Sequence, residues 1–385
     1  MMKCNVCQTE LDKPLYESPS DQSLTSLCEL RQGKVKVWLC SSCGHLSGEA
    51  LPDTKDFYES EYRIMLNQDD EDQIYEVRNK HIVYRTAHQL DILFAKLDLP
   101  KGSRILDYGC AKALMSSRLR SIRPDLQVCL FDVSNMYITY WQKFLSADNW
   151  AIHKTPENWL GSFDVVTSFF ALEHIPDPID TVHSVAALLN KDGIFYGIVP
   201  DTFGNVADFI VIDHVNHFTE YSLYFLLKSA GFNNIKIDAN AHRGALVFIA
   251  QKSGDTSICL NLKSSLKASE QLAGYWTSMA NRLKVAESEH IRLPAAIYGS
   301  GFYGAYIFSM LEKPQNVRCF LDMNPFQQTK RFFGRVVLEP SKLSNDIRLL
   351  YIGLSPHIAR DLVGKMDWLR DRDIKLIFLD KRLAC

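Results

Sequence analysis

Two pairs of cysteines near the start of the printed sequence have the spacing of a metal-binding site. Cys4 and Cys7 form one C-x2-C pair, and Cys40 and Cys43 form the second. Each pair can sit on a tight turn with both sulfurs facing one point, and two such turns supply a tetrahedral set of thiolates for zinc. Because a zinc ion enclosed by four sulfurs has no open position, we expect it to be structural rather than catalytic.

The segment that carries these cysteines is too small to bury much of a core. A structural zinc ion would therefore supply much of its folding free energy. Residues 35–39 between the two pairs predict a short strand leading into the second pair, which is typical of a zinc ribbon. Cys28 and His45 are spare ligands, and a set of free cysteines is the alternative.

A second group of residues has the pattern of a nucleotide-cofactor site. The apolar run Ile105–Leu106 leads into the motif DYGC at 107–110, and Ala111 and Ala113 precede a helical pattern that begins at Leu114. A turn of small residues between a strand and a helix lets the backbone approach a ligand, and the helix N-terminus offers unpaired N–H groups. We therefore expect these residues to line the site: Asp107, Gly109, Cys110 and Ala111.

An acid at the end of the next apolar run completes this pattern. Residues 126–132 predict the following strand, which ends at Asp132 and is followed by Val133. An acid at the tip of the second strand of a βαβ unit can accept hydrogen bonds from ribose hydroxyls. A dinucleotide site would need the full G-x-G-x-x-G pattern, whereas two of the small positions here are alanine.

A long loop downstream concentrates histidine and acidic side chains. Residues 201–219 follow an apolar run at 191–200, and they contain Asp213, His214 and His217. Site residues gather in loops above the carboxyl ends of strands, and a neutral histidine is available as a base at physiological pH. We expect this loop to be functional, and hydrogen-bonded packing of the loop is the alternative.

The composition is that of an ordinary globular protein. Of the 385 residues, 46% are apolar and 23% are charged, and the formal net charge is −2. This length allows two or three domains and a sizeable core. The near-neutral charge gives no sign of nucleic-acid binding or of a basic membrane face. The sequence shows no membrane-length apolar run and no signal-peptide pattern, so we expect a cytoplasmic protein with reduced cysteines.

The elements that must position these groups alternate between helices and strands. Residues 74–97 predict an amphipathic helix, and 163–178 predict a strand that runs into a loop. The run at 191–200 predicts another strand, and 229–238 with 244–250 predict a closing antiparallel pair. This order indicates an α/β fold with a Rossmann-like sheet.

A second glycine-rich turn predicts another α/β domain near the C-terminus. Gly299, Gly301 and Gly304 match G-x-G-x-x-G between a strand pattern and a helical run, and Asp322 ends the next strand pattern. A lone match of this kind is weak support for a bound dinucleotide. The alternatives are that the turn keeps its geometry and meets a different ligand, or none.

Residues 80–252 resemble the class I S-adenosylmethionine-dependent methyltransferases. The resemblance rests on the motifs DYGC, FDVV, LEHIPDP and SAGF in that order. It implies S-adenosylmethionine as the cofactor, with Asp132 on the ribose and the 107–113 loop at the methionine end. The expected domains are a zinc-binding ribbon at 1–65, a methyltransferase domain at 66–255, a helical linker at 256–290 and a C-terminal Rossmann-like domain at 291–385.

The order of the whole chain, nearly all 385 residues, resembles the zinc-containing sugar-nucleotide C-methyltransferases. Members of that family methylate a carbon of a nucleotide-linked keto-deoxysugar. The resemblance implies that Asp213 and His214 match a Glu-His pair whose histidine is proposed as the base. It also implies that His174 matches the histidine after the fourth strand, and that Tyr62 matches a tyrosine near the end of the ribbon.

The chain departs from that family at three places. Asp213 stands where the family has glutamate, a family tyrosine two positions before that acid falls on Val211, and residues 111–113 read Ala-Lys-Ala where Gly-Asp/Asn-Gly is usual. These departures keep two alternatives open. One is an O- or N-methyltransferase acting on another glycan or small molecule, and the other is a non-catalytic binding protein with a degenerate cofactor loop.

The chemistry that the resemblance implies is coherent. A C–H next to a ketone is acidic enough for a positioned histidine to remove, which gives an enolate that attacks the sulfonium methyl group. His214 is the expected base, with His174 and His217 as rivals. We expect a nucleotide-linked sugar as substrate, no nucleic-acid or membrane partner, and a monomer or small homo-oligomer.

Overall fold

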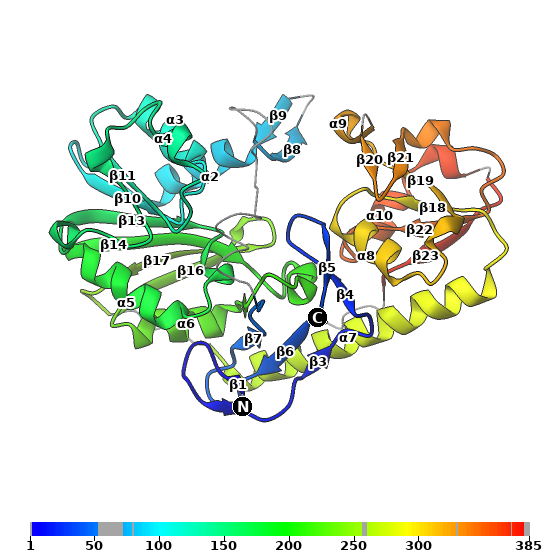
Figure 1. Ribbon diagram of the computed structural model, residues 1–385, viewed down its shortest axis with the longest axis horizontal. Helices are drawn as coiled ribbons and strands as arrows, with labels where there is room; N and C mark the ends of the chain where they lie inside the picture. The colour runs from blue at the N-terminus through cyan, green and yellow to red at the C-terminus, as the bar shows by residue number, and fades with distance from the viewer. Residues whose placement is uncertain are drawn as a thin grey trace. The chain divides into compact units, whose positions relative to one another are not determined.

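The computed structural model describes residues 2–52, 72–78, 81–255, 260–328, 330–370 and 372–380 (Figure 1). The chain forms two compact units, which are described separately. The first unit comprises Met1–Glu10, Cys40–Asn205 and Val215–Leu262. The second unit comprises Leu11–Leu39, Val206–His214 and Lys263–Cys385.

A seven-stranded sheet is the centre of the first unit. Its strands are β10 (Arg104–Tyr108), β11 (Gln127–Asp132), β12 (Trp150–Ile152), β13 (Phe163–Phe169), β14 (Leu189–Pro200), β16 (Asn234–His242) and β17 (Ala245–Gln251). Their order is β12-β11-β10-β13-β14-β17-β16. Strands β10 to β14 run parallel, and β17 is antiparallel to both of its neighbours. This arrangement confirms the expected Rossmann-like methyltransferase sheet.

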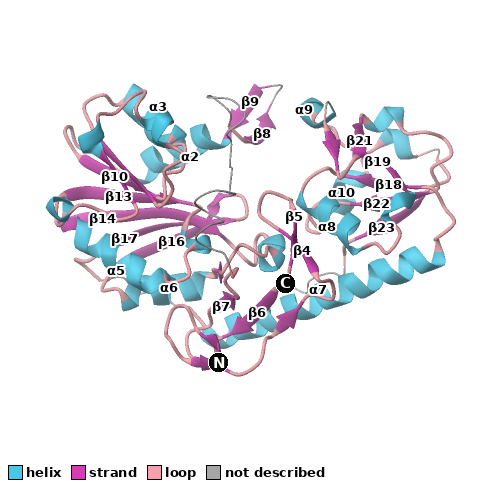
Figure 2. Cartoon of the chain, viewed as in Figure 1, coloured by secondary structure: helices cyan, strands magenta, loops and turns pink. Residues whose placement is uncertain are grey.

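Helices flank this sheet on both faces (Figure 2). They are α2 (Arg85–Lys96), α3 (Leu114–Ile122), α4 (Ile138–Trp141), α5 (Pro178–Leu188) and α6 (Glu220–Ser229). Burial on both faces explains the nearly continuous apolar sequence of the parallel strands, as in β13. Helix α5 begins with a proline after Asp177, whose carboxylate caps the helix, and Thr219 with Ser222 forms a capping box on α6.

The expected helix over 74–97 is only half correct. Residues Ile74–Arg78 form β8, which pairs antiparallel with β9 (His81–Tyr84), and the helix α2 begins at Arg85. The segment ahead of α2 is rich in Ile, Val and Tyr, whose branched and aromatic side chains favour a strand. The helical periodicity therefore belongs to the second half of the segment alone.

Short strands make up the N-terminal part of each unit. In the first unit, β7 (Leu46–Gly48) pairs antiparallel with β15 (Asn216–His217), and β1 is Met2–Lys3. In the second unit, β3 (Tyr16–Glu17) pairs with β6 (Lys36–Leu39), and β4 (Gln22–Leu24) pairs with β5 (Leu30–Gln32). Strand β2 is Glu10–Leu11.

A second, mixed six-stranded sheet forms the body of the second unit, as the sequence predicts. Its strands are β18 (Ala295–Tyr298), β19 (Val317–Leu321), β20 (Arg331–Phe332), β21 (Arg335–Leu338), β22 (Leu349–Ile352) and β23 (Lys375–Phe378). The helices of this unit are α7 (Leu262–Glu289), α8 (Phe302–Met310), α9 (Pro325–Gln328) and α10 (Ala359–Val363). The single long helix α7 occupies most of the expected linker.

Close backbone packing accounts for two of the three glycines of the C-terminal G-x-G-x-x-G motif, Gly299 and Gly304. Gly299 has a φ of 101°, and a Cβ atom there would lie 2.3 Å from the carbonyl oxygen of Gly353. A Cβ atom on Gly304 would lie 2.0 Å from the carbonyl oxygen of Gly299. Side chains cannot occupy these two positions, so the fold needs both glycines whether or not a ligand binds there.

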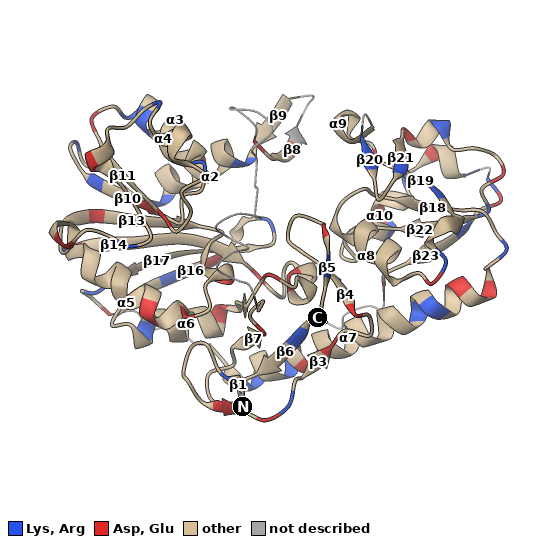
Figure 3. Cartoon of the chain, viewed as in Figure 1, with Lys and Arg blue, Asp and Glu red and all other residues tan. Residues whose placement is uncertain are grey.

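Acidic and basic residues are interspersed over the elements of both units (Figure 3), in agreement with the near-neutral net charge. Across the described ranges, no helix has both the length and the apolar character that a membrane span requires.

Candidate functional site

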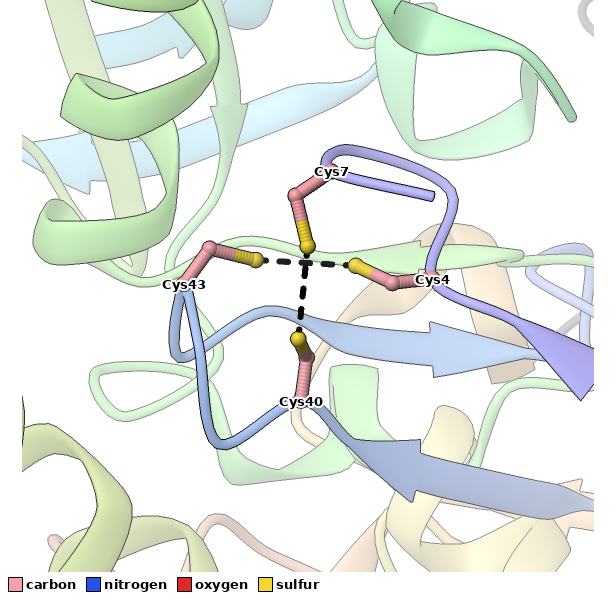
Figure 4. Close-up of side chains that lie close together, drawn as sticks. All are labelled: Cys4, Cys7, Cys40 and Cys43. Atoms are coloured by element: carbon pink, nitrogen blue, oxygen red, sulfur yellow. Dashed lines mark hydrogen bonds between the residues drawn. The ribbon is translucent and has the colours of Figure 1, made fainter. Parts of the chain in front are cut away.

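Four cysteine side chains converge on one point in the first unit (Figure 4). The Sγ atoms of Cys4 and Cys43 are 3.5 Å apart, and those of Cys7 and Cys40 are 3.4 Å apart. All four Sγ atoms lie within 4.8 Å of one another. Zinc–sulfur bonds of about 2.3 Å in a tetrahedron place neighbouring sulfurs about 3.8 Å apart. The four sulfurs therefore fit a zinc ion.

The crowded cysteines shift the pKa values of the Cys4, Cys40 and Cys43 thiols. Hydrogen bonding to Cys40 raises the pKa of the Cys4 thiol to about 12, and hydrogen bonding to Cys4 raises the pKa of Cys43. Hydrogen bonding to Cys4 lowers the pKa of the Cys40 thiol. Crowded thiolates repel one another, and a bound metal ion removes this conflict because it deprotonates coordinating thiols.

The two turns that carry the cysteines are held by backbone hydrogen bonds. The N–H of Gln8 donates to the carbonyl of Cys4, and the N–H of Gly44 donates to the carbonyl of Cys40. Gly44 has a φ of 66°, which favours glycine at this turn. His45, a spare ligand by sequence, lies outside the cluster, and its Nε2 is 3.1 Å from Oδ1 of Asn216. The other spare ligand, Cys28, is not a member either.

The loop between β10 and α3 adopts a left-handed backbone at three positions. Gly109 has a φ of 75°, Ala111 of 45° and Ala113 of 56°. A Cβ atom on Gly109 would lie 2.7 Å from Cβ of Ala171, so this position requires glycine. The two alanines therefore keep a conformation that glycine adopts more readily.

Neighbouring side chains hold the alanines in this conformation. The indole Nε1 of Trp141 donates to the carbonyl oxygen of Ala111 at 2.7 Å. Ala113 is buried in a cluster with Leu130 and Trp141. The alanine substitutions that distinguish this chain from the resembled family are thus accommodated by packing, and the loop keeps its turn.

Asp132 is fixed to this loop at the end of β11. Its Oδ2 accepts a hydrogen bond from the N–H of Ala111 at 2.8 Å, and its Oδ1 accepts one from the N–H of Ser134 at 3.0 Å. Burial raises its pKa. Each carboxylate oxygen has a second lone pair that can accept a ligand hydroxyl. Val133 beside it is 47% exposed and offers an apolar contact.

Asp107 connects the same loop to α3 and β13. Its Oδ2 accepts a hydrogen bond from the Ser116 hydroxyl at 2.6 Å, and Oδ1 lies 3.5 Å from the Thr167 hydroxyl. Burial raises the pKa of Asp107 to about 7. Burial also raises the pKa of the neighbouring Cys110 thiol well above its ordinary value, which favours the protonated thiol over the thiolate.

His214 forms a buried pair with Asp208 in the second unit. Its Nδ1 lies 2.6 Å from Oδ1 of Asp208, six residues earlier on the η5 turn (Val206–Ile210). An ionised carboxylate can only accept, so Nδ1 carries the hydrogen and Nε2 is the nitrogen that can take up a proton. Sequence reasoning missed Asp208, although an acid in the same loop as the histidine was the available signal.

Asp213 contacts Ser26. Its Oδ1 accepts a hydrogen bond from the N–H of Ser26 at 2.7 Å, and its Oδ2 accepts one from the Ser26 hydroxyl at 2.8 Å. The N–H of Ile212 donates to the carbonyl of Leu24 beside it. Asp213 thus fastens the segment 206–214 to the segment 11–39.

The remaining predicted site residues belong to other elements of the chain. His174 ends the η4 turn (Leu172–His174) after β13 and is partly buried. His217 is fully buried on β15, where it pairs with Leu46. Both belong to the first unit. Tyr62 falls outside the described residues.

Comparison with known proteins identifies the domain. Residues 78–237 match the model of the family described as "Methyltransferase domain". Together with the sheet order and the loop at 107–113, this match shows that the chain carries a class I S-adenosylmethionine-dependent methyltransferase domain.

Curated relatives share part of this domain. The ubiquinone biosynthesis O-methyltransferase of Xanthomonas oryzae pv. oryzae (strain PXO99A) is 33% identical over 119 residues, which are 27% of this chain and 46% of that protein. The same enzyme of Xanthomonas campestris pv. campestris (strain B100) is 30% identical over 122 residues, 28% of this chain and 47% of that protein. The chain spans about half the length of these relatives.

Among solved structures, the complex between the Haloferax volcanii Trm112 methyltransferase activator and a methyltransferase is similar. It shares 17% identity with a TM-score of 0.38, over 45% of this chain and 92% of that chain.

Proposed function

We propose that the protein is an S-adenosylmethionine-dependent methyltransferase that methylates a carbon of a nucleotide-linked keto-deoxysugar. The observation that carries the proposal at the level of the reaction class is the cofactor loop, whose left-handed turn is fixed to Asp132. The resemblance of the whole chain to the zinc-containing sugar-nucleotide C-methyltransferases supplies the substrate class. When bound, S-adenosylmethionine provides an electrophilic methyl group on a sulfonium.

Different residues of the chain bind the cofactor and remove the proton. Asp132 binds the ribose hydroxyls, and the backbone of the 107–113 loop meets the methionine end of the cofactor. Nε2 of His214 removes a proton from the carbon next to the substrate ketone, and the electron pair of that C–H bond forms an enolate. The enolate carbon then attacks the methyl group as the bond from methyl to sulfur breaks.

The pairing of His214 with Asp208 supports the role of the base. A carboxylate on Nδ1 holds the imidazole in one tautomer and stabilises the imidazolium that forms when Nε2 takes up the proton. His174 and His217 are rival bases. The zinc ion is structural in this scheme, because four sulfurs leave it no position for substrate.

The test is incubation of the full chain with methyl-labelled S-adenosylmethionine and a panel of nucleotide-linked 4-keto sugars, followed by mass spectrometry. The proposal predicts a label bonded to a sugar carbon next to the ketone. A label on oxygen or nitrogen would support the second candidate, transfer to a heteroatom. That candidate is favoured by the curated relatives, which are named O-methyltransferases, and by Val211 and Asp213, where the chain departs from the resembled family.

A further inference from the structure

His242, the last residue of β16, holds a ring nitrogen to which no described residue forms a hydrogen bond. Its Nδ1 lies 3.2 Å from the backbone carbonyl oxygen of Arg243. A carbonyl oxygen only accepts, so Nδ1 carries the hydrogen and Nε2 carries the lone pair. Nε2 is buried and has no hydrogen-bond partner within the described parts of the chain. Buried polar atoms usually have a hydrogen-bond partner, so this nitrogen can accept a hydrogen bond from a ligand.

Three aromatic side chains surround this imidazole. The ring centroid of His242 lies 4.9 Å from that of Tyr75, 5.3 Å from that of His88 and 5.4 Å from that of Phe170. We call these four residues the aromatic cluster. His242 is only 5% exposed, whereas the other three are partly exposed. The cluster therefore reaches solvent, and the unused acceptor lies beneath it.

Cations face the cluster from two elements. The Arg85 guanidinium of α2 lies 3.7 Å from the centroid of the Phe170 ring, and that of Arg243 lies 5.2 Å from the centroid of the Tyr75 ring. Burial, followed by the charge of Arg85, lowers the pKa of His242 to about 4, with smaller contributions from His88 and Arg243. The imidazole is thus neutral at physiological pH, and the charge around it favours an anionic ligand.

The cluster lies at the same edge of the sheet as the cofactor loop, within the first unit. Phe170 follows β13 directly and has a φ of 52°, an uncommon conformation for a bulky residue that often marks functional sites. The next residue, Ala171, is the neighbour that leaves no room for a Cβ atom on Gly109. The N–H of Asp201, after β14, donates to the carbonyl of Gly244. Ligands of such sheets bind at the carboxyl ends of the strands.

We propose that the aromatic cluster is the subsite for the sugar of the methyl acceptor, in which Nε2 of His242 accepts a hydrogen bond from a sugar hydroxyl. The rings of Tyr75 and Phe170 pack against the C–H face of the sugar, and Arg85 pairs with phosphate charge. This inference rests on the proposed function, which supplies the substrate class. Because Nε2 is buried, one of the surrounding rings must shift before the hydroxyl can reach it. Tyr75 belongs to the two-stranded β8–β9 hairpin, and its hydroxyl accepts a hydrogen bond from the Arg243 N–H at 2.9 Å that such a shift would break.

The test is calorimetry on the full chain saturated with S-adenosylhomocysteine. The probes are deoxythymidine diphosphate-4-keto-6-deoxyglucose and deoxythymidine diphosphate alone. His242→Phe keeps an aromatic ring but removes the acceptor, so it weakens binding of the sugar nucleotide about 10- to 100-fold and leaves the affinity for the diphosphate unchanged. Arg85→Met weakens binding of both probes. The control is His183→Gln, an exposed position on α5.

Retained binding of S-adenosylhomocysteine shows that each variant is folded. Equal affinity of His242→Phe and the parent for the sugar nucleotide overturns the inference, as does a parent that binds S-adenosylhomocysteine but neither probe. In both cases the methyltransferase assignment stands. A parent that does not bind S-adenosylhomocysteine removes the proposed function and the inference with it.

Nitrogen NMR of the histidine-labelled chain gives a readout that needs no substrate. At pH 6, the inference requires a hydrogen on Nδ1 of His242 and none on Nε2. A hydrogen on Nε2 in the free protein overturns it, because that nitrogen could not then accept from a hydroxyl.

Discussion

The carboxylate of Asp132 accepts a hydrogen bond from the backbone N–H of Ala111 at 2.8 Å, so the acid that ends one strand sets the loop that follows its neighbour. The second unit repeats this device: the carboxylate of Asp322 accepts from the N–H of Ser300 at 3.0 Å and also from the Ser300 hydroxyl at 2.6 Å. The Ser300 hydroxyl thus uses an acceptor position on Asp322, whereas the equivalent position on Asp132 can accept a hydrogen bond from a ligand. The difference favours ligand binding in the first unit.

Asp132→Asn should weaken binding of S-adenosylhomocysteine by about 1.5–3 kcal/mol, because ribose hydroxyls lose a charged acceptor. Calorimetry measures this change. Asp322→Asn is the matched control, since it alters the equivalent acid of the second unit and should leave the affinity as it is. An unchanged dissociation constant in Asp132→Asn would refute the role given to this acid.

Ala111→Gly should be neutral or stabilising. The left-handed backbone at φ 45° costs an alanine about 1–2 kcal/mol, and the greater freedom of glycine in the unfolded chain offsets about 0.5–1 kcal/mol of the relief. Ala187→Gly, at an exposed position in helix α5, should instead destabilise by about 1 kcal/mol. Chemical denaturation compares the two variants. Equal destabilisation by both would mean that position 111 is not strained.

One zinc ion per chain should copurify with the protein, and Cys40→Ser should lose it. The fold around the cysteines depends on the metal, so limited proteolysis should cut this variant near its N-terminus while the main sheet still melts cooperatively. Cys28→Ser should keep the zinc, because Cys28 is not a member of the cluster. Elemental analysis of protein purified without chelators decides the matter, and a metal-free parent would contradict the assignment.

The pKa of Asp107 near 7 predicts a specific pH dependence of stability. Its folded pKa of about 7 exceeds the ordinary value of 3.8, so the folded state holds the proton more tightly than the unfolded state between these pH values. Stability therefore falls as pH rises from about 4 to about 7 and levels off above the folded pKa, with a total loss on the order of 4 kcal/mol. Denaturation of Asp107→Asn and the parent at pH 5 and pH 8 should show the variant gaining relative stability at the higher pH. If the difference in unfolding free energy between Asp107→Asn and the parent does not change with pH, the effect of burial on Asp107 is contradicted.

His214→Asn should abolish solvent hydrogen exchange at the substrate carbon and methyl transfer to it. Asp208→Asn should lower the rate constant for exchange about 10²- to 10⁴-fold, because the imidazole loses the carboxylate that fixes its tautomer. His174→Asn and His217→Asn run in parallel as rival bases. If His214→Asn exchanges at the parental rate while a rival variant is inactive, the base lies elsewhere.

The sequence predicts those parts of the site that depend on local pattern. Spacing alone places Cys4, Cys7, Cys40 and Cys43 together, and hydrophobic runs place Asp107 and Asp132 at strand ends. These features are carried by residues close in the chain or by regular strand order, so they do not depend on details of packing.

Contacts that depend on irregular turns escape such reasoning. The η5 turn determines which acid meets His214, and it selects Asp208 over the adjacent Asp213. The tautomer of His242 depends on the direction of one backbone carbonyl, and no motif surrounds that histidine. Alanines at 111 and 113 suggested a degenerate loop, but Trp141 and its neighbours preserve the turn.

Titration of the zinc-loaded full chain with S-adenosylhomocysteine tests the central claim most directly. The account predicts saturable binding of one molecule per chain and an increase in melting temperature, both weakened by Asp132→Asn and unaffected by Asp322→Asn. The absence of heat and of any thermal shift in the folded parent would contradict the claim that this protein is an S-adenosylmethionine-dependent methyltransferase.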